Sequence, residues 1–158
     1  DKDLGEHCKR IMDINVNGVF NTVHPAIRLM QPRERGQIAI ISSLAGYHGL
    51  ATAPIYSTSK ACVKAYGEGL RGLYVKHGIE INVVCPGYVK SALTDTNNFP
   101  MPFLMETDKA VKALRRGLER NQGRITFPWQ LSLIYGFMVR FFPEWLFDRV
   151  FRVMPRKN

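Results

Sequence analysis

The sequence predicts an α/β fold in which a parallel sheet is layered with helices. The continuous apolar run at 37–42 is typical of a strand that is buried on both faces, as strands of parallel sheets are, and 79–85 is predicted as a second strand. Segments with apolar residues at three- and four-residue steps alternate with these runs. Such alternation gives parallel strands joined by right-handed helical crossovers.

The first element is a long helix, expected over 4–30, with apolar positions recurring at helical spacing. Pro25 lies within it, so a kink is expected there. A charged loop at 32–36 leads into the first strand at 37–42. That strand is expected to be covered on both faces.

A Gly/Ala/Ser-rich loop at 43–53 separates the first strand from a second helix over 54–77. Gly78 follows the helix where a left-handed cap is favoured. The second strand, 79–85, is expected to stop at the Pro86-Gly87 pair.

The last third of the chain predicts a helix, a strand and an apolar tail. After an irregular stretch at 88–105, Thr107 is expected to cap a basic helix that runs to about residue 121. A short strand follows at 124–127, and one or two apolar helices over 129–154 are split by Pro143. The sequence therefore divides into a layered part, 1–128, and a helical extension, 129–158, of the same domain.

Composition restricts the kinds of site. Cys8, Cys62 and Cys85 are odd in number and show no C-x-x-C spacing, which argues against disulfides and zinc and suits a reducing compartment. The four histidines lack metal-ligand spacing, so no metal is expected. The net charge is +9, and the residues from 106 onward carry eleven Lys/Arg against five Asp/Glu. Without interleaved aromatics in the basic helix, we expect no nucleic-acid partner.

A candidate active site lies beyond the first strand, because ligands of open parallel sheets sit at the carboxyl ends of strands. Ser43 ends that strand, and Tyr56 and Lys60 share one face of the following helix. An ammonium group favours the ionised form of a neighbouring phenol, which can then exchange a proton near neutral pH. Ser43 could hydrogen-bond the same substrate oxygen as charge develops on it.

Four segments in order carry a more specific resemblance. They are Ser42-Ser43-Leu44-Ala45-Gly46, Tyr56-Ser57-Thr58-Ser59-Lys60, the Asn15-containing stretch 13–20, and the stretch 82–89 with its Pro-Gly pair. Together they resemble the short-chain dehydrogenases, closely over residues 5–95 and loosely beyond. The resemblance implies a Rossmann-like, doubly wound parallel sheet, of which this chain would hold about three strands and their flanking helices, and a role as an NAD(P)-dependent oxidoreductase.

Within that resemblance, four residues take catalytic roles. Tyr56 would be the acid/base, and Lys60 would assist it and bind the nicotinamide ribose. Ser43 would orient the substrate carbonyl. Asn15 would anchor a water that relays protons, and it is preferred over Asn17 because it stands three residues before Gly18, as in the family's motif.

The cofactor, NAD or NADP, would be bordered by the segment after the second strand. The resemblance implies contacts from Pro86, Gly87 and the Val89 backbone, and from Ser91, which stands where the family usually has threonine. Four more residues lie in the same region as weaker candidates for substrate contact: Ser42, Tyr47, His48 and Tyr88.

The family's pyrophosphate-binding turn has no counterpart here. The chain contains no G-x-x-x-G-x-G and no Asn-Asn-Ala-Gly, and its first residue falls where the family's fourth helix should begin. We therefore expect this chain to be the catalytic portion of such an enzyme, without the half that binds most of the cofactor, and to be inactive by itself. The residue that would choose between NAD and NADP is also expected in that half.

The tail leaves three readings open: a substrate lid or core packing, a subunit contact, or a membrane surface. Its longest uncharged run, fifteen residues, is shorter than the roughly 20 needed to cross a bilayer. The aromatic tail and the loop at 99–103 favour an apolar alcohol or ketone as substrate. We expect a cytoplasmic protein, with membrane contact at most peripheral, that is a homo-oligomer in its full-length form. The alternative function is a non-catalytic interaction domain on the same scaffold.

Overall fold

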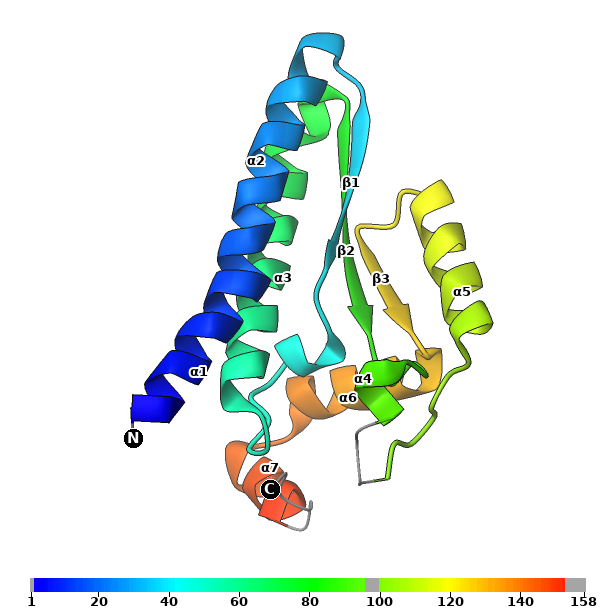
Figure 1. Cartoon of the computed structure of the whole chain (residues 1–158). Helices are drawn as coiled ribbons and strands as arrows, with labels where there is room; N and C mark the ends of the chain where they lie inside the picture. The colour runs from blue at the N-terminus through cyan, green and yellow to red at the C-terminus, as the bar shows by residue number, and fades with distance from the viewer. Residues whose placement is uncertain (1, 96–99, 153–158) are drawn as a thin grey trace.

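The computed structural model describes residues 2–95 and 100–152, and it confirms the α/β fold. Three parallel strands form one sheet in the order β1 (Gly36–Ile41), β2 (Ile79–Pro86) and β3 (Arg124–Phe127). Figure 1 shows the sheet between two helical layers, with α2 (Gly18–Met30) and α3 (Pro54–Tyr74) on one side and α5 (Thr107–Glu119) on the other.

The first helix is continuous but not uniform. α1 (Lys2–Met12) runs into a π-helical turn, η1 (Asp13–Asn17), and then into α2. No break occurs at Pro25, which lies inside α2, and the helix continues to Met30. The departure from α-helical geometry falls instead at η1, where the side chain of Asn15 reaches Ser59 on α3.

The second helix ends as its sequence predicts. After α3 a single 3₁₀ turn, η4 (Val75–His77), leads to Gly78, whose φ of 65° is left-handed. A side chain at Gly78 would collide with the carbonyl oxygen of Glu34, so the close approach of the two loops needs glycine as well.

Strand β1 is not covered on both faces, contrary to the sequence prediction. Its exposure alternates: Ile40 is 2% exposed and Ile41 is 47% exposed. The physical reason is position, since β1 is an edge strand among the described residues and α5 packs over β3 and β2 rather than over β1. β2, the central strand, is the one buried on both sides: Ile81, Val83 and Cys85 are fully buried on one face, and Asn82 and Val84 on the other.

A polar network that the sequence did not indicate joins β2 to the turn before β3. Asn82 is fully buried and donates to the carbonyl of Gln122 at 2.7 Å. Arg71 on α3 donates to the carbonyl of Ile81 at 2.7 Å and to the side chain of Asn121 at 2.8 Å. Because each buried polar group has a partner, the network costs little and fixes the turn against α3.

The segment between β2 and α5 contains a short helix, α4 (Ala92–Asp95), and a parallel bridge between Val89 and Met105. Residues 96–99, which include Phe99 of the loop considered for substrate contact, lie outside the described residues. Thr107 does not cap α5 with its side chain; its hydroxyl donates to the carbonyl of Lys90 at 2.7 Å. The helix also ends earlier than expected, at Glu119, because Asn121 is left-handed.

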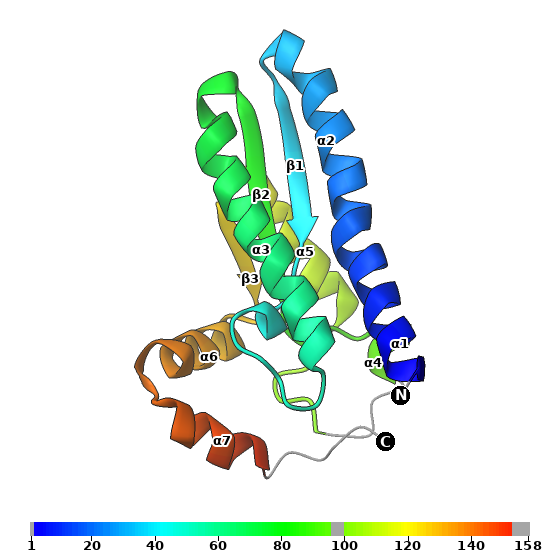
Figure 2. The ribbon, with the colours of Figure 1, turned by 90° about the vertical axis from the view of Figure 1, so that its left-hand side faces the viewer.

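The tail forms α6 (Trp129–Phe141) and α7 (Glu144–Arg152), broken at Pro143 as predicted; residues 153–158 lie outside the described part. Figure 2 shows both helices beyond the carboxyl ends of the strands. Leu131 and Tyr135 pack on the cluster that contains Leu44 and Val83. Phe147 is buried and stacks on His48 with ring centroids 4.1 Å apart. Within the described residues, no helix is both long and apolar enough to cross a membrane.

Two glycines of α3 provide a matched test of this packing. A Cβ at Gly67 would lie 2.6 Å from Cγ2 of Val83, a stiff and fully buried side chain, whereas a Cβ at Gly69 would meet nothing within 4 Å. Gly67→Ala should therefore lower the free energy of unfolding by about 1–3 kcal/mol through overpacking. Gly69→Ala should raise it by about 0.5–1 kcal/mol, because alanine loses less backbone entropy in a helix. Urea unfolding of the intact protein measures both, and equal effects would contradict the packing of α3 on β2.

Candidate active site

The carboxyl ends of β1 and β2 bring the sequence-predicted residues to one region. Ser43 follows β1 and opens a 3₁₀ turn, η3 (Leu44–Gly46), which packs against the first turns of α3. The Ser43 hydroxyl accepts from the amide of Ala45 at 3.1 Å and donates to the carbonyl of Pro86 at 3.3 Å. Its position is thus fixed by both strand ends.

Lys60 and Tyr56 lie one turn apart near the start of α3. The ammonium of Lys60 is 5.7 Å from the centre of the Tyr56 ring and donates to the carbonyl of Ile41 at 3.2 Å. Burial lowers the pKa of Lys60. Lys60 therefore links α3 to the last residue of β1, two positions before Ser43.

Asn15 joins this group through a residue that sequence reasoning missed. Its amide donates to the hydroxyl of Ser59 at 3.0 Å, and Ser59 donates to the carbonyl of Tyr56 at 2.7 Å. Asn17 is exposed and donates to Asp13 instead. The structure thus brings Asn15, and not Asn17, to α3. The signal available in the sequence was a serine inside a predicted helix, because such a serine commonly donates to a carbonyl of the preceding turn.

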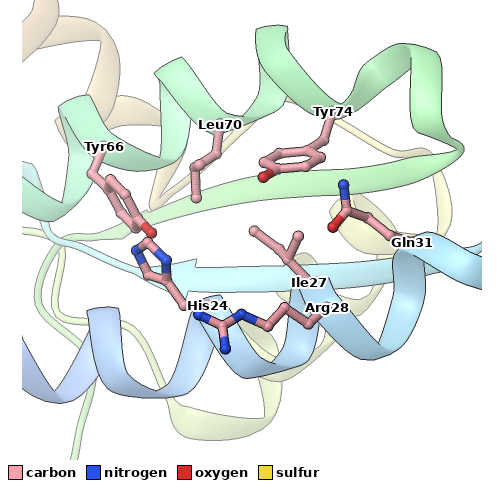
Figure 3. Close-up of a pocket in the computed structure, with 7 residues that line it drawn as sticks. All are labelled: His24, Ile27, Arg28, Gln31, Tyr66, Leu70 and Tyr74. Carbon is pink, nitrogen blue, oxygen red and sulfur yellow. The ribbon is translucent and has the colours of Figure 1, made fainter.

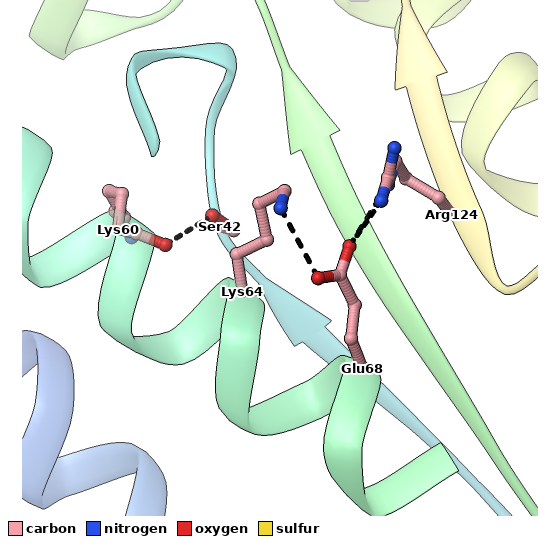
Figure 4. A network of polar contacts seen from close by, with 5 residues as sticks. All are labelled: Ser42, Lys60, Lys64, Glu68 and Arg124. Atoms are coloured by element: carbon pink, nitrogen blue, oxygen red, sulfur yellow. Dashed lines mark hydrogen bonds and ion pairs between the residues drawn. The ribbon is translucent and has the colours of Figure 1, made fainter. Parts of the chain in front are cut away.

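Two contacts hold the loop after β1 against α3. The Ser42 hydroxyl is buried and donates to the carbonyl of Lys60 at 2.7 Å (Figure 4). Gly46 lies so close to α3 that a Cβ there would be 2.8 Å from the carbonyl carbon of Lys60. Ser42 was considered for substrate contact, but its hydroxyl hydrogen is used in a bond within the protein. Ser43, between the two contacts, is held in register with Lys60.

Three other tyrosines near the strand ends remain protonated at neutral pH. Burial raises the pKa of Tyr47 and of Tyr135 to about 12, and it also raises the pKa of Tyr88. A phenol with so high a pKa can donate a hydrogen bond but cannot act as a base near pH 7.

Two ion pairs meet at Glu68, one within α3 and one that joins α3 to β3, and the sequence indicated only the one within α3. Glu68 accepts from Lys64 at 3.2 Å and from Arg124 at 2.5 Å (Figure 4). Both cations also lie over the Tyr47 ring, at 5.1 Å and 5.5 Å from its centre. Lys64 and Glu68 have the i,i+4 spacing that signals a pair. Arg124, which the sequence counted with the basic tail, is instead fixed between β3 and α3.

The residues expected to border a cofactor lie after β2, and each has a structural role as well. Gly87 donates to the carbonyl of Phe127 at 2.7 Å and leaves no room for a side chain, since a Cβ would meet Leu131 at 2.7 Å. Val89 pairs with Met105. The Ser91 hydroxyl is within 3.4 Å of the Thr94 amide at the start of α4, so capping is its visible role.

A hollow of about 160 Å³ lies elsewhere, between α2 and α3 (Figure 3). Its lining includes His24, Arg28 and Tyr66 but none of the sequence-predicted site residues. The Tyr66 hydroxyl is buried there without a hydrogen-bond partner among the described residues. Over that same part of the chain, no cluster of metal-ligating side chains forms, and the three cysteines are free.

Comparisons with known proteins identify the family of the chain. Residues 2–100 match the short chain dehydrogenase family. An uncharacterized oxidoreductase of Myxococcus xanthus is 42% identical over 147 residues, which are 93% of this chain and 58% of that protein. The chain spans about half the length of the curated relatives it matches.

Two solved structures share the fold at low sequence identity. A short chain dehydrogenase from Burkholderia cenocepacia in complex with NADP is 21% identical, with a TM-score of 0.81 over 92% of this chain and 61% of that one. A short-chain dehydrogenase from Sphingobium yanoikuyae in complex with NADPH is 18% identical, with a TM-score of 0.74 over 97% and 59%. The family match and the Myxococcus relative carry the assignment: this chain belongs to the short-chain dehydrogenases, a family of oxidoreductases.

Proposed function

We propose that the intact protein moves a hydride between a nicotinamide cofactor and an alcohol or ketone, with residues 1–128 as the catalytic part and 129–158 as a helical extension. The observation that carries the proposal is the position of the Lys60 ammonium, which lies 5.7 Å from the Tyr56 ring and donates to the carbonyl of Ile41, the last residue of β1, two positions before Ser43. A phenol, an ammonium and a hydroxyl at one strand end suit proton transfer to a carbonyl oxygen.

The proposed roles follow from the chemistry of each group. The Ser43 hydroxyl would turn from the carbonyl of Pro86, to which it donates in the structure, and donate to the substrate oxygen. Tyr56 gives that oxygen a proton during reduction. The ammonium of Lys60 stabilises the phenolate that remains. Asn15, through Ser59, holds the first turn of α3 that carries Tyr56. The bound cofactor would supply the hydride.

The donor set fits a nicotinamide nucleoside. Lys60 has three N–H bonds, and the structure uses one of them on the carbonyl of Ile41, which leaves donors for ribose hydroxyls. Ser91 and the backbone at Val89 lie beyond β2, where the resemblance expects the carboxamide. Structures of the same fold hold NADP and NADPH, so we propose NADP as the first cofactor to try.

The substrate we propose is apolar. Leu131 and Tyr135 are partly buried apolar residues that pack on the core residue Leu44, which follows β1. Apolar walls with a few convergent polar groups are typical of sites for hydrophobic ligands. To test the function, NADPH and NADH oxidation by the intact protein is followed with ketones of increasing apolar bulk. Cofactor binding without oxidation across the whole panel would favour the non-catalytic alternative.

The 158 residues alone should bind NADPH far more weakly than the intact protein does. The chain contains no Gly-rich turn between a strand and a helix to hold the pyrophosphate, which is the main polar anchor of such cofactors. Calorimetric titration of both proteins checks this, and equal affinities would show that the isolated chain has a complete site.

Replacing Asn15 with alanine should lower kcat, whereas Asn17→Ala should leave it unchanged. Asn15 is bonded to Ser59 under the first turns of α3, but Asn17 is exposed and bonded to Asp13. A displacement of about 1 Å in the turn that carries Tyr56 can cost about 10²-fold in rate. Steady-state kinetics of both variants, with circular dichroism as a check on folding, test the pair. A matched loss in both variants would remove Asn15 from the proposed site.

A further inference from the structure

We propose that the outer face of α6 and the start of α7 form a docking surface for an anionic lipid membrane. The surface, called here the tail stripe, consists of residues that share large apolar side chains and high exposure: Trp129, Leu133, Ile134, Phe137, Phe141 and Trp145. It lies outside the proposed active site and does not depend on the proposed reaction.

The tail stripe concentrates exposed apolar surface. Each of its six members is between 47% and 68% exposed, and both tryptophans of the chain are among them. Large exposed apolar residues are normal when scattered singly, but a contiguous set marks an interaction surface. Phe137 and Phe141 also contact each other, with ring centroids 4.8 Å apart.

The spacing shows that the stripe is one face and not a poorly packed helix. Trp129, Leu133, Phe137 and Phe141 recur at every fourth residue of α6 and therefore line one side of it. The opposite side of α6 is packed, because Leu131 and Tyr135 contact the core cluster that contains Leu44 and Val83. α7 is fixed in the same way by Phe147, which is buried against His48.

Charge favours a membrane as the occupant over a neutral apolar partner. Arg140 on α6 and Arg149 on α7 are exposed, as is Glu144 at the start of α7. Over residues 129–158 the sequence has five Lys/Arg and two Asp/Glu. Tryptophans near the ends of an apolar face, with arginines beside it, are typical of helices that lie in the interface of anionic bilayers.

The test is flotation of the intact protein with vesicles of phosphatidylcholine, with and without added phosphatidylglycerol. We expect flotation with the anionic vesicles that falls as salt rises. Phe137→Gln with Phe141→Gln should reduce the bound fraction at least about tenfold, since each buried phenylalanine contributes roughly tenfold or more to partitioning. Arg140→Glu should weaken binding to the anionic vesicles alone, by about tenfold.

The matched control replaces two apolar side chains of similar exposure on other helices. Leu73→Gln with Val111→Gln, at 63% and 55% exposure, should bind vesicles as the unchanged protein does. Vesicle binding that is absent, that survives alkaline carbonate, or that the phenylalanine pair does not change would overturn the proposal. Light scattering gives a further test. If the unchanged protein binds no vesicles and the phenylalanine pair dissociates an oligomer, the stripe is a subunit contact and the proposal is wrong.

Discussion

Tyr56→Phe in the intact protein is expected to lower kcat for ketone reduction by about 10²–10⁴-fold, the usual contribution of a general acid. The change removes one hydroxyl and keeps the ring beside the ammonium of Lys60, so the fold should not change. NADPH-linked turnover with the best ketone of the panel measures the loss.

Tyr47→Phe is the control for this experiment. Tyr47 is also near the strand ends, but its pKa of about 12, raised mainly by burial, keeps it from ionising near pH 7. It should lose far less activity than Tyr56→Phe. Retention of most turnover by Tyr56→Phe would sink the assignment of Tyr56 as the acid.

The second large effect is expected from a residue with no side chain. Gly46→Ala places a Cβ 2.8–2.9 Å from three backbone atoms of Lys60 and Ala61, and backbone cannot move aside as a side-chain tip can. The loop should shift away from α3, and Ser43 would shift with it. Displacement of a positioning group by about 1 Å can cost about 10²-fold in rate. Overpacking should also cost about 1–3 kcal/mol of stability.

Gly49→Ala is the matched control, in the same loop but with nothing within 4 Å of the added Cβ. Kinetics and urea unfolding of the two variants separate loss of activity from loss of fold. A Gly46→Ala protein that is folded and fully active would show that close contact between η3 and α3 is not needed for the site.

The sequence alone predicted the elements that local signals define. The three strands, the break at Pro143 and the left-handed Gly78 follow from apolar runs, a proline and a helix end, all of which act over a few residues. The grouping of Ser43 with Lys60 was predictable for the same reason: both follow one strand end at short range.

Features that depend on tertiary contacts were not predictable in this way. The exposure of β1 depends on which strand lies beside it, which the apolar run at 37–42 does not encode. Thr107 has the right residue type for a cap, but a carbonyl from a distant loop binds its hydroxyl instead. The distortion at η1, rather than at Pro25, accompanies a bond to Ser59, which is 44 residues away in sequence.

The free edge of β1 has a practical consequence for work with this chain alone. Among the described residues β1 pairs only with β2, so the amides and carbonyls on its other side form a ready template for a foreign strand. Ile41, half exposed at the end of that edge, adds an apolar contact to any such pairing. Preparations of the 158 residues should therefore be kept dilute, and the edge is the first place to introduce a charged substitution when solubility limits an experiment.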